Sequence, residues 1–166
     1  MFDIGDLIIY SGQGICRIDA ICEKTYLGVT KDYYVLHPVE NKKLEISIPV
    51  DNDKVKMLNL MPPEEAEEMI ESFKLPGIEW IEVMGTRAQT YSDIVKHGNR
   101  RDIAKLANTL MRKKRMTEGC GRRFHEKDKQ LLTHIQHILF AELAISLTTT
   151  YEEIARRIDG LINEQH

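Results

Sequence analysis

The chain has 166 residues, of which 42% are apolar and 30% are charged, and its formal net charge is −3. This length and composition are ordinary for a globular protein of one domain or two small ones, and no apolar run approaches the ~20 residues of a membrane-spanning helix. The first residues show no basic segment followed by an apolar one, so no signal peptide, no membrane contact and a cytoplasmic location are expected.

The first 59 residues alternate between apolar and polar side chains with the period of two that is typical of β-strands. The alternation predicts strands over 7–10, 15–22, 31–37, 44–48 and 55–57. The turn that holds Gly12 and Gly14 opens a strand and not a helix, which favours a hairpin with positive φ over a phosphate-binding loop. Cys16 and Cys22 lie six residues apart, which predicts that both point to one face of the second strand. Five short antiparallel strands favour a small SH3-like or Tudor-like barrel over residues 1–59.

From residue 60 onward the apolar spacing changes to the 3.6-residue period of amphipathic helices. The spacing predicts a first helix and linker over 60–77, and helices over 86–97, 100–114 and 127–147. A last helix begins with the capping box Thr150–Glu153, and 116–123 is predicted to be a loop. The predicted fold class is therefore α+β in two domains, an antiparallel barrel followed by an all-α domain of about five helices over residues 60–166.

Basic residues are concentrated in the stretch from Asn99 to Arg123. This stretch contains nine basic residues and only two acidic ones, Asp102 and Glu118, so its local charge is 9 − 2 = +7. One interpretation is a phosphate-binding surface. The alternative is a solvated helix face, with Arg112–Arg115 favoured by the negative end of the helix dipole. The nine residues are Arg100, Arg101, Lys105, Arg112, Lys113, Lys114, Arg115, Arg122 and Arg123.

Several short motifs follow one another along the chain. They are the opening Gly5–Tyr10 (GDLIIY) with the glycine turn after it, then Tyr33–Leu36, Ile48-Pro49 and the helical segment Ile138–Ala144. In this order they resemble the CarD/CdnL family of transcription regulators, whose barrel module also occurs in the transcription-repair coupling factor. The resemblance covers nearly the whole chain. It implies a barrel that binds the β1 lobe of the RNA polymerase β subunit, and a helical domain that contacts promoter DNA near the upstream edge of the transcription bubble.

The resemblance also implies individual roles. Two basic positions that grip the polymerase in the family fall on Lys24 and Ser47 here, and Lys42 and Lys43 lie near the second position in sequence. Arg87 matches a position that touches the DNA backbone.

The family typically places a tryptophan as a wedge in the minor groove, and that position falls on Met84. The only tryptophan of the chain is Trp80, whose alternative role is to anchor the core. Three alternatives therefore stay open: Met84 is the wedge, Trp80 replaces it, or the protein has no wedge.

We therefore expect a monomeric, non-enzymatic transcription regulator that modulates the stability of the open promoter complex with low sequence specificity, located at the nucleoid through RNA polymerase. A ribosome-binding or RNA-binding module built on an SH3-like barrel is the alternative. It would carry its positive charge on the barrel, yet residues 1–59 have a charge of 7 − 9 = −2. His134 and His137 have a metal-like spacing without a third ligand, so no metal or cofactor is expected, and no catalytic constellation is evident.

Overall fold

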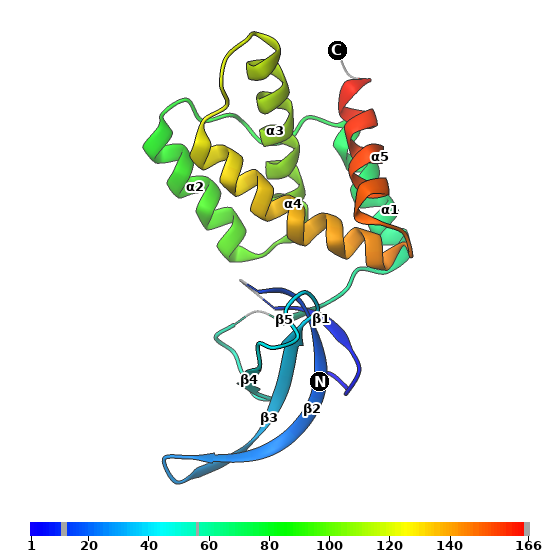
Figure 1. Ribbon diagram of the computed structural model, residues 1–166. Coiled ribbons are helices and arrows are strands. Elements are labelled where there is room, and N and C mark those ends of the chain that lie inside the picture. Colours follow the sequence, from blue (N-terminus) through cyan, green and yellow to red (C-terminus); the bar gives the residue numbers. More distant parts are fainter. Residues whose placement is uncertain (11–12, 56, 165–166) are drawn as a thin grey trace. The chain divides into compact units, whose positions relative to one another are not determined.

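The computed structural model describes residues 1–10, 13–55 and 57–164. The chain divides into two compact units, Met1–Leu60 and Met61–His166. The first unit is an antiparallel β-sheet and the second is built of helices (Figure 1). The α+β fold class predicted from the sequence is confirmed.

The sheet contains five strands among the described residues, in the order β4-β3-β2-β1-β5, and every neighbouring pair is antiparallel. Since the edge strands β4 and β5 do not pair with each other within these residues, the sheet is barrel-like but not closed. The strands are β1 (Leu7–Tyr10), β2 (Gly14–Tyr26), β3 (Val29–Pro38), β4 (Ile46–Pro49) and β5 (Met57–Asn59).

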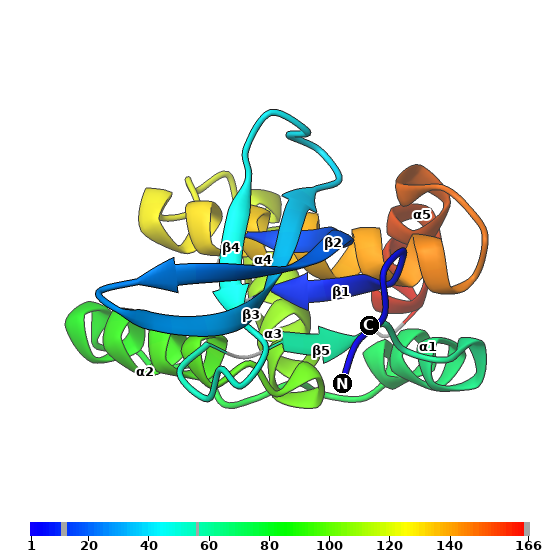
Figure 2. The same cartoon turned by 90° about the horizontal axis from the view of Figure 1, so that it is seen from below.

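The β2–β3 hairpin is longer than the alternation of side chains predicts. It continues to a tight turn at Leu27 and Gly28, whose φ angles of 49° and 77° are both positive, as a two-residue hairpin turn of type I′ requires. Figures 1 and 2 show the two strands extending well beyond the shorter strands beside them. Residues near this turn pack on no core, so the alternation of apolar and polar residues that marks a half-buried strand is absent there.

A β-bulge in β2 overturns the prediction that Cys16 and Cys22 share a face. The pairing with β3 shifts between Ile18 and Ala20, so Asp19 is an extra residue and the alternation of faces reverses after it. Cys16 is completely buried, whereas Cys22 is only half-buried.

Three further sequence predictions for the barrel have different outcomes. Gly14 has a positive φ of 79° as expected, and Gly12 lies outside the described residues. The fourth strand begins at Ile46, so Leu44 is outside it and exposed. The fifth strand begins where its prediction ends, at Met57, and Lys56 lies outside the described residues.

The helical unit contains α1 (Pro63–Glu71), the short 3-10 helix η1 (Ser72–Lys74), α2 (Met84–His97), α3 (Arg100–Gly119), α4 (Glu126–Ser146) and α5 (Tyr151–Asn163). Side chains cap three of the helices. Asn99 accepts a hydrogen bond from the amide of Asp102, and Thr150 accepts one from the amide of Glu153, as the capping-box motif predicts. The third cap is His125 at the start of α4.

Helix α4 is central to this unit, since it packs against α1, α2, α3 and α5. Its apolar stripe includes Leu132, Ile135, Leu139 and Leu143, all buried in one cluster with residues of every other helix. No single helix among the described residues is long and apolar enough to cross a membrane; α4 and α5 meet that criterion only as a pair, which is bent by 107°.

Candidate nucleic-acid interface

The basic cluster Arg112–Arg115 lies in the body of α3 and not at its end. Because α3 continues to Gly119, no basic residue occupies its last turn. The stabilisation of cations by the helix dipole falls off within the last turn. The dipole interpretation of the cluster is therefore wrong. The role of each basic side chain must be inferred from its own contacts.

Four of the nine basic side chains of the stretch are held by partners within the helical unit. Arg100 forms an ion pair with the buried Glu142, with 2.7 Å between nitrogen and oxygen. Arg112 donates a 2.7 Å hydrogen bond to the carbonyl oxygen of Phe73. The other two pairs are Lys114 with Glu118 at 2.7 Å and Arg115 with Asp159 at 3.8 Å. Three of these contacts join α3 to other helices, and the Lys114–Glu118 pair lies within α3.

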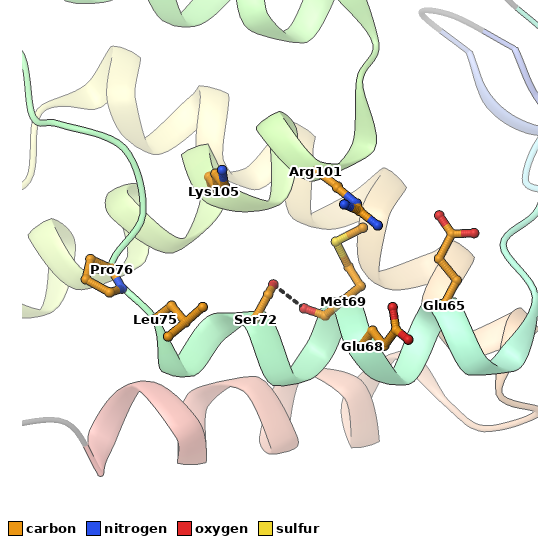
Figure 3. Close-up of a pocket in the computed structure, with 8 residues that line it drawn as sticks. All are labelled: Glu65, Glu68, Met69, Ser72, Leu75, Pro76, Arg101 and Lys105. Carbon is orange, nitrogen blue, oxygen red and sulfur yellow. Dashed lines mark hydrogen bonds between the residues drawn. The ribbon is translucent and has the colours of Figure 1, made fainter.

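Arg101 and Lys105 line a groove whose opposite wall is acidic. The groove lies between α3 and the α1–η1 segment, and Glu65 and Glu68 line it from α1 (Figure 3). Among the described residues, neither cation forms an ion pair. Since two carboxylates repel a phosphate that approaches the same groove, these cations are weaker candidates for DNA contact. The remaining lining of the groove consists of Met69, Ser72, Leu75 and Pro76.

Three cations of the stretch remain. Arg122 and Arg123 lie in the loop after α3 and are exposed, and Lys113 on α3 is half-buried. Within the described part of the chain, none of the three pairs with a carboxylate. The ammonium of Lys113 lies 5.2 Å from the centre of the Trp80 ring.

The two candidates for an apolar wedge differ in exposure. Trp80 is half-buried against the helical core, and the guanidinium carbon of Arg87 lies 4.4 Å from the centre of its ring, in a cation–π arrangement. Met84 begins α2 and is 49% exposed, and Val83 before it is 66% exposed. A wedge must be able to enter the groove of DNA, so the geometry favours Met84 over Trp80.

Arg87 is buried, with 6% of its surface exposed. Its guanidinium forms a two-point pair with the carboxylate of Asp128, with Nε–Oδ1 and Nη2–Oδ2 distances of 3.0 and 2.8 Å. Its remaining nitrogen, Nη1, donates to the carbonyl oxygen of Ile81 at 2.9 Å. A guanidinium held in this way is not accessible to a phosphate, so contact of Arg87 with the DNA backbone does not fit this structure.

Sequence reasoning missed two residues of this region, Val83 and Asp128. Val83 did carry a signal, because it is apolar and stands directly before Met84. Asp128 carried none, because a polar residue at the start of a helix is ordinary, and its partner Arg87 lies 41 residues away in the sequence.

The polymerase candidates lie in the barrel unit. The ammonium of Lys24 on β2 donates a 2.6 Å hydrogen bond to the hydroxyl oxygen of Ser47 on β4, so the two positions form one surface. Lys42 and Lys43 lie in the turn between β3 and β4, and both are exposed.

Comparison with known protein families gives two matches. Residues 2–61 match the family described as "CarD-like/TRCF RID domain", and residues 61–159 match "CarD, C-terminal domain". The two matches meet at the boundary between the structural units, Leu60 and Met61. The chain is also 25% identical over 157 residues to a protein of Bacillus subtilis (strain 168) named "Putative transcription factor YdeB", covering 93% of this chain and 97% of that protein.

Proposed function

The chain belongs to the CarD family, and from this premise we propose that it is a non-enzymatic bacterial transcription regulator acting on the open promoter complex. Its barrel binds the β subunit of RNA polymerase at the β1 lobe. Its helical unit contacts promoter DNA at the upstream edge of the bubble. The observation that carries the proposal is the presence of both family domains in the family's order over residues 2–159.

The polymerase contact that we propose centres on Lys24 and Ser47. Lys24 keeps the positive charge of the family's first gripping position, and its hydrogen bond to Ser47 brings the second position to the same surface. Lys42 and Lys43 add two exposed charges in the turn before β4. Charges at the rim of an interface mainly steer the encounter of the partners and fix its register.

The DNA contact that we propose uses the apolar pair Val83 and Met84 together with Lys113, Arg122 and Arg123. The apolar pair enters the minor groove and separates a base step, which is easiest at the edge of DNA that is already melted. The three cations contact phosphates, which positions the protein without reading base edges. Low sequence specificity follows from this division.

Recruitment by the polymerase explains how so few cations suffice. The whole chain has a net charge of −3, so its affinity for free DNA is weak. Binding to the polymerase turns the DNA contact into an intramolecular step with a high effective concentration. A protein of this kind acts from the cytoplasm on polymerase that is already at a promoter.

The test uses the full chain with the RNA polymerase holoenzyme of its own bacterium. Two measurements are made on each variant: binding to polymerase without DNA, and the half-life of the open promoter complex after a competitor is added. Lys24→Glu is expected to weaken binding to polymerase and, with it, the effect on the half-life. The triple variant Lys113→Glu/Arg122→Glu/Arg123→Glu is expected to bind polymerase normally and to lose its effect on the half-life.

Two results would contradict the proposal. If the unmodified chain does not bind polymerase, the function itself is wrong. If the triple variant changes the half-life as the unmodified chain does, the DNA contact lies elsewhere on the helical unit.

A further inference from the structure

An extended segment without helix or strand connects η1 to α2, and we name residues 75–83 the strap. Such a segment has backbone carbonyls that must find partners outside regular secondary structure. Five strap carbonyls accept hydrogen bonds from side chains of α2 and α3. The donors are Asn108 to Leu75 at 2.6 Å, Thr109 to Ile78 at 2.7 Å, Tyr91 to Glu79 at 2.9 Å, and Arg87 to Ile81 at 2.9 Å and to Glu82 at 3.3 Å.

Arg87 holds the end of the strap that precedes the exposed apolar pair. Its Nη1 donates to the last two carbonyls before Val83, and its other two nitrogens, Nε and Nη2, donate to the carboxylate of Asp128. Asp128 is 5% exposed, so both charges of the pair are out of water. A buried guanidinium keeps a fixed orientation when a carboxylate binds it at two points.

Trp80 completes this arrangement from within the strap. Its ring packs against the helical core, with Arg87 over it and the ring of Tyr91 edge-on to it, 6.3 Å away between centres. Burial raises the pKa of the Tyr91 hydroxyl, which therefore stays protonated and donates to the strap. Val83, the last residue of the strap, and Met84 after it are exposed, although the strap before Val83 is held by these hydrogen bonds.

We propose that Arg87 and Asp128 are positioning residues for the DNA wedge: their pair fixes the strap so that Val83 and Met84 point outward at the start of α2. Trp80 serves as the support of this strap and not as the wedge. The inference rests on the proposed function, because it names what holds the proposed DNA-contacting pair in place. It also assigns a role to Arg87 that its buried position permits.

The pair is tested with Asp128→Asn, which keeps the shape of the side chain and removes its charge, and with Arg87→Lys, which keeps the charge and removes the fork of donors. In the free protein, the emission of Trp80 is expected to shift to the red and to become more accessible to acrylamide. Since Trp80 is the only tryptophan, the signal reports the strap alone. With polymerase and promoter, the effect on open-complex half-life is expected to fall on the order of tenfold, as loss of an apolar wedge implies.

The matched control is Glu142→Gln. It breaks a second arginine–carboxylate pair of the same unit, between Arg100 and the buried Glu142, and Glu142 accepts its further hydrogen bond from the amide of Met61, which lies outside the strap. Asp128→Asn, Arg87→Lys and Glu142→Gln are all measured at a temperature at which circular dichroism shows them folded. Glu142→Gln is expected to leave the Trp80 emission and the open-complex half-life unchanged. Equal effects of Glu142→Gln and Asp128→Asn would overturn the inference.

A double-mutant cycle separates positioning from general stability. The surface variant Val83→Ala/Met84→Ala removes the wedge without touching the buried pair. In that background Asp128→Asn is expected to have no further effect on the half-life, and an undiminished effect would overturn the inference. If Val83→Ala/Met84→Ala itself leaves the half-life unchanged, the wedge of the proposed function is wrong. If that variant reduces the effect of the protein on the half-life and Asp128→Asn does not, only the role of the pair is wrong.

Discussion

Lys24 and Ser47 are 23 residues apart in the sequence, yet the ammonium of Lys24 lies 2.6 Å from the hydroxyl oxygen of Ser47. The contact joins β2 to β4 across β3, so both polymerase positions inferred from the family belong to one surface of the sheet. A serine replaces a basic residue at the second position, and here it orients the charge at the first.

Reversal of that charge is the first prediction. Lys24→Glu is expected to weaken binding to polymerase by ~1–2 kcal/mol, or roughly 5- to 30-fold. The reason is that it replaces the positive charge proposed to contact polymerase by a negative one. The comparison is Ser47→Ala, which removes the hydroxyl that holds the ammonium but keeps the positive charge, and it is expected to weaken binding less than Lys24→Glu does. Biolayer interferometry with immobilised polymerase measures both. Unchanged affinity of the Lys24 variant would move the interface away from this surface.

The second prediction concerns Arg122 and Arg123, which have no carboxylate partner among the described residues. Each phosphate contact contributes about −0.9 to the slope of log affinity against log salt concentration. Arg122→Gln/Arg123→Gln is therefore expected to make the slope for promoter DNA shallower by roughly 2. Arg115→Gln is the matched control, because Arg115 is held by Asn163 and Asp159 and should leave the slope unchanged. An equal change of the slope in the two variants would contradict the prediction. It would mean that an ion pair in the free protein does not keep an arginine from contacting DNA.

Periodicity predicted the class and order of the elements because most helices and strands here bury one face. The prediction from periodicity failed where an element continues through residues that bury no apolar face. The end of α3 is one such place: residues after Arg112 are mostly charged, so the apolar repeat fades at Lys114. The helix nevertheless continues to Gly119, since these residues favour helix and the Lys114–Glu118 pair supports it at i, i+4 spacing.

Two other features were beyond sequence reasoning for different reasons. The bulge at Asp19 is a single extra residue that changes no composition, yet it reverses the faces of every residue after it in β2. The burial of Arg87 depends on Asp128, a partner that only the packing of α2 against α4 brings near. Charge in a sequence indicates an accessible surface only when no distant carboxylate neutralises it.

The third prediction tests how closely the strap packs on α3. A β-carbon added at Gly77 would lie 2.4 Å from the carbonyl oxygen of Lys105 and 2.9 Å from the amide nitrogen of Thr109. These are backbone atoms of a packed helix and cannot move aside cheaply, so Gly77→Ala is expected to lower the free energy of unfolding by about 1–3 kcal/mol. Gly160→Ala is the control, since among the described residues nothing beyond its own helix backbone and chain neighbours lies within 4 Å of the added carbon, and it should stabilise α5 by ~0.5–1 kcal/mol. Urea denaturation measures both, and a Gly77→Ala protein as stable as the parent would refute the close contact.

The fourth prediction concerns the order in which the cysteines react. Burial raises the pKa of the Cys16 thiol to about 11, and the residue has no exposed surface. Cys120 is exposed and Cys22 is half-buried. Since the thiolate is the reactive form, a disulfide reagent at pH 8 is expected to modify Cys120 first and Cys22 more slowly. Cys16 should react only when urea unfolds the barrel, and its rapid modification in the native protein would contradict the buried position.

The same thiol predicts how stability depends on pH. Because the folded state raises the pKa of Cys16 above its ordinary value of 9.0, the folded protein holds this proton between about pH 9 and 11 while the unfolded chain releases it. Stability rises with pH only where the unfolded state binds more protons, so here it must fall as pH rises through that window. The contribution is fully present below about pH 9 and amounts to roughly 2–3 kcal/mol, at 1.36 kcal/mol for each tenfold change in proton affinity. Tyrosines and lysines titrate in the same range, so the comparison is with Cys16→Ala, whose free energy of unfolding should fall less steeply from pH 9 to 11. Parallel curves for the two proteins would show that the thiol ionises equally easily in the folded and unfolded states, which the core position of Cys16 does not permit.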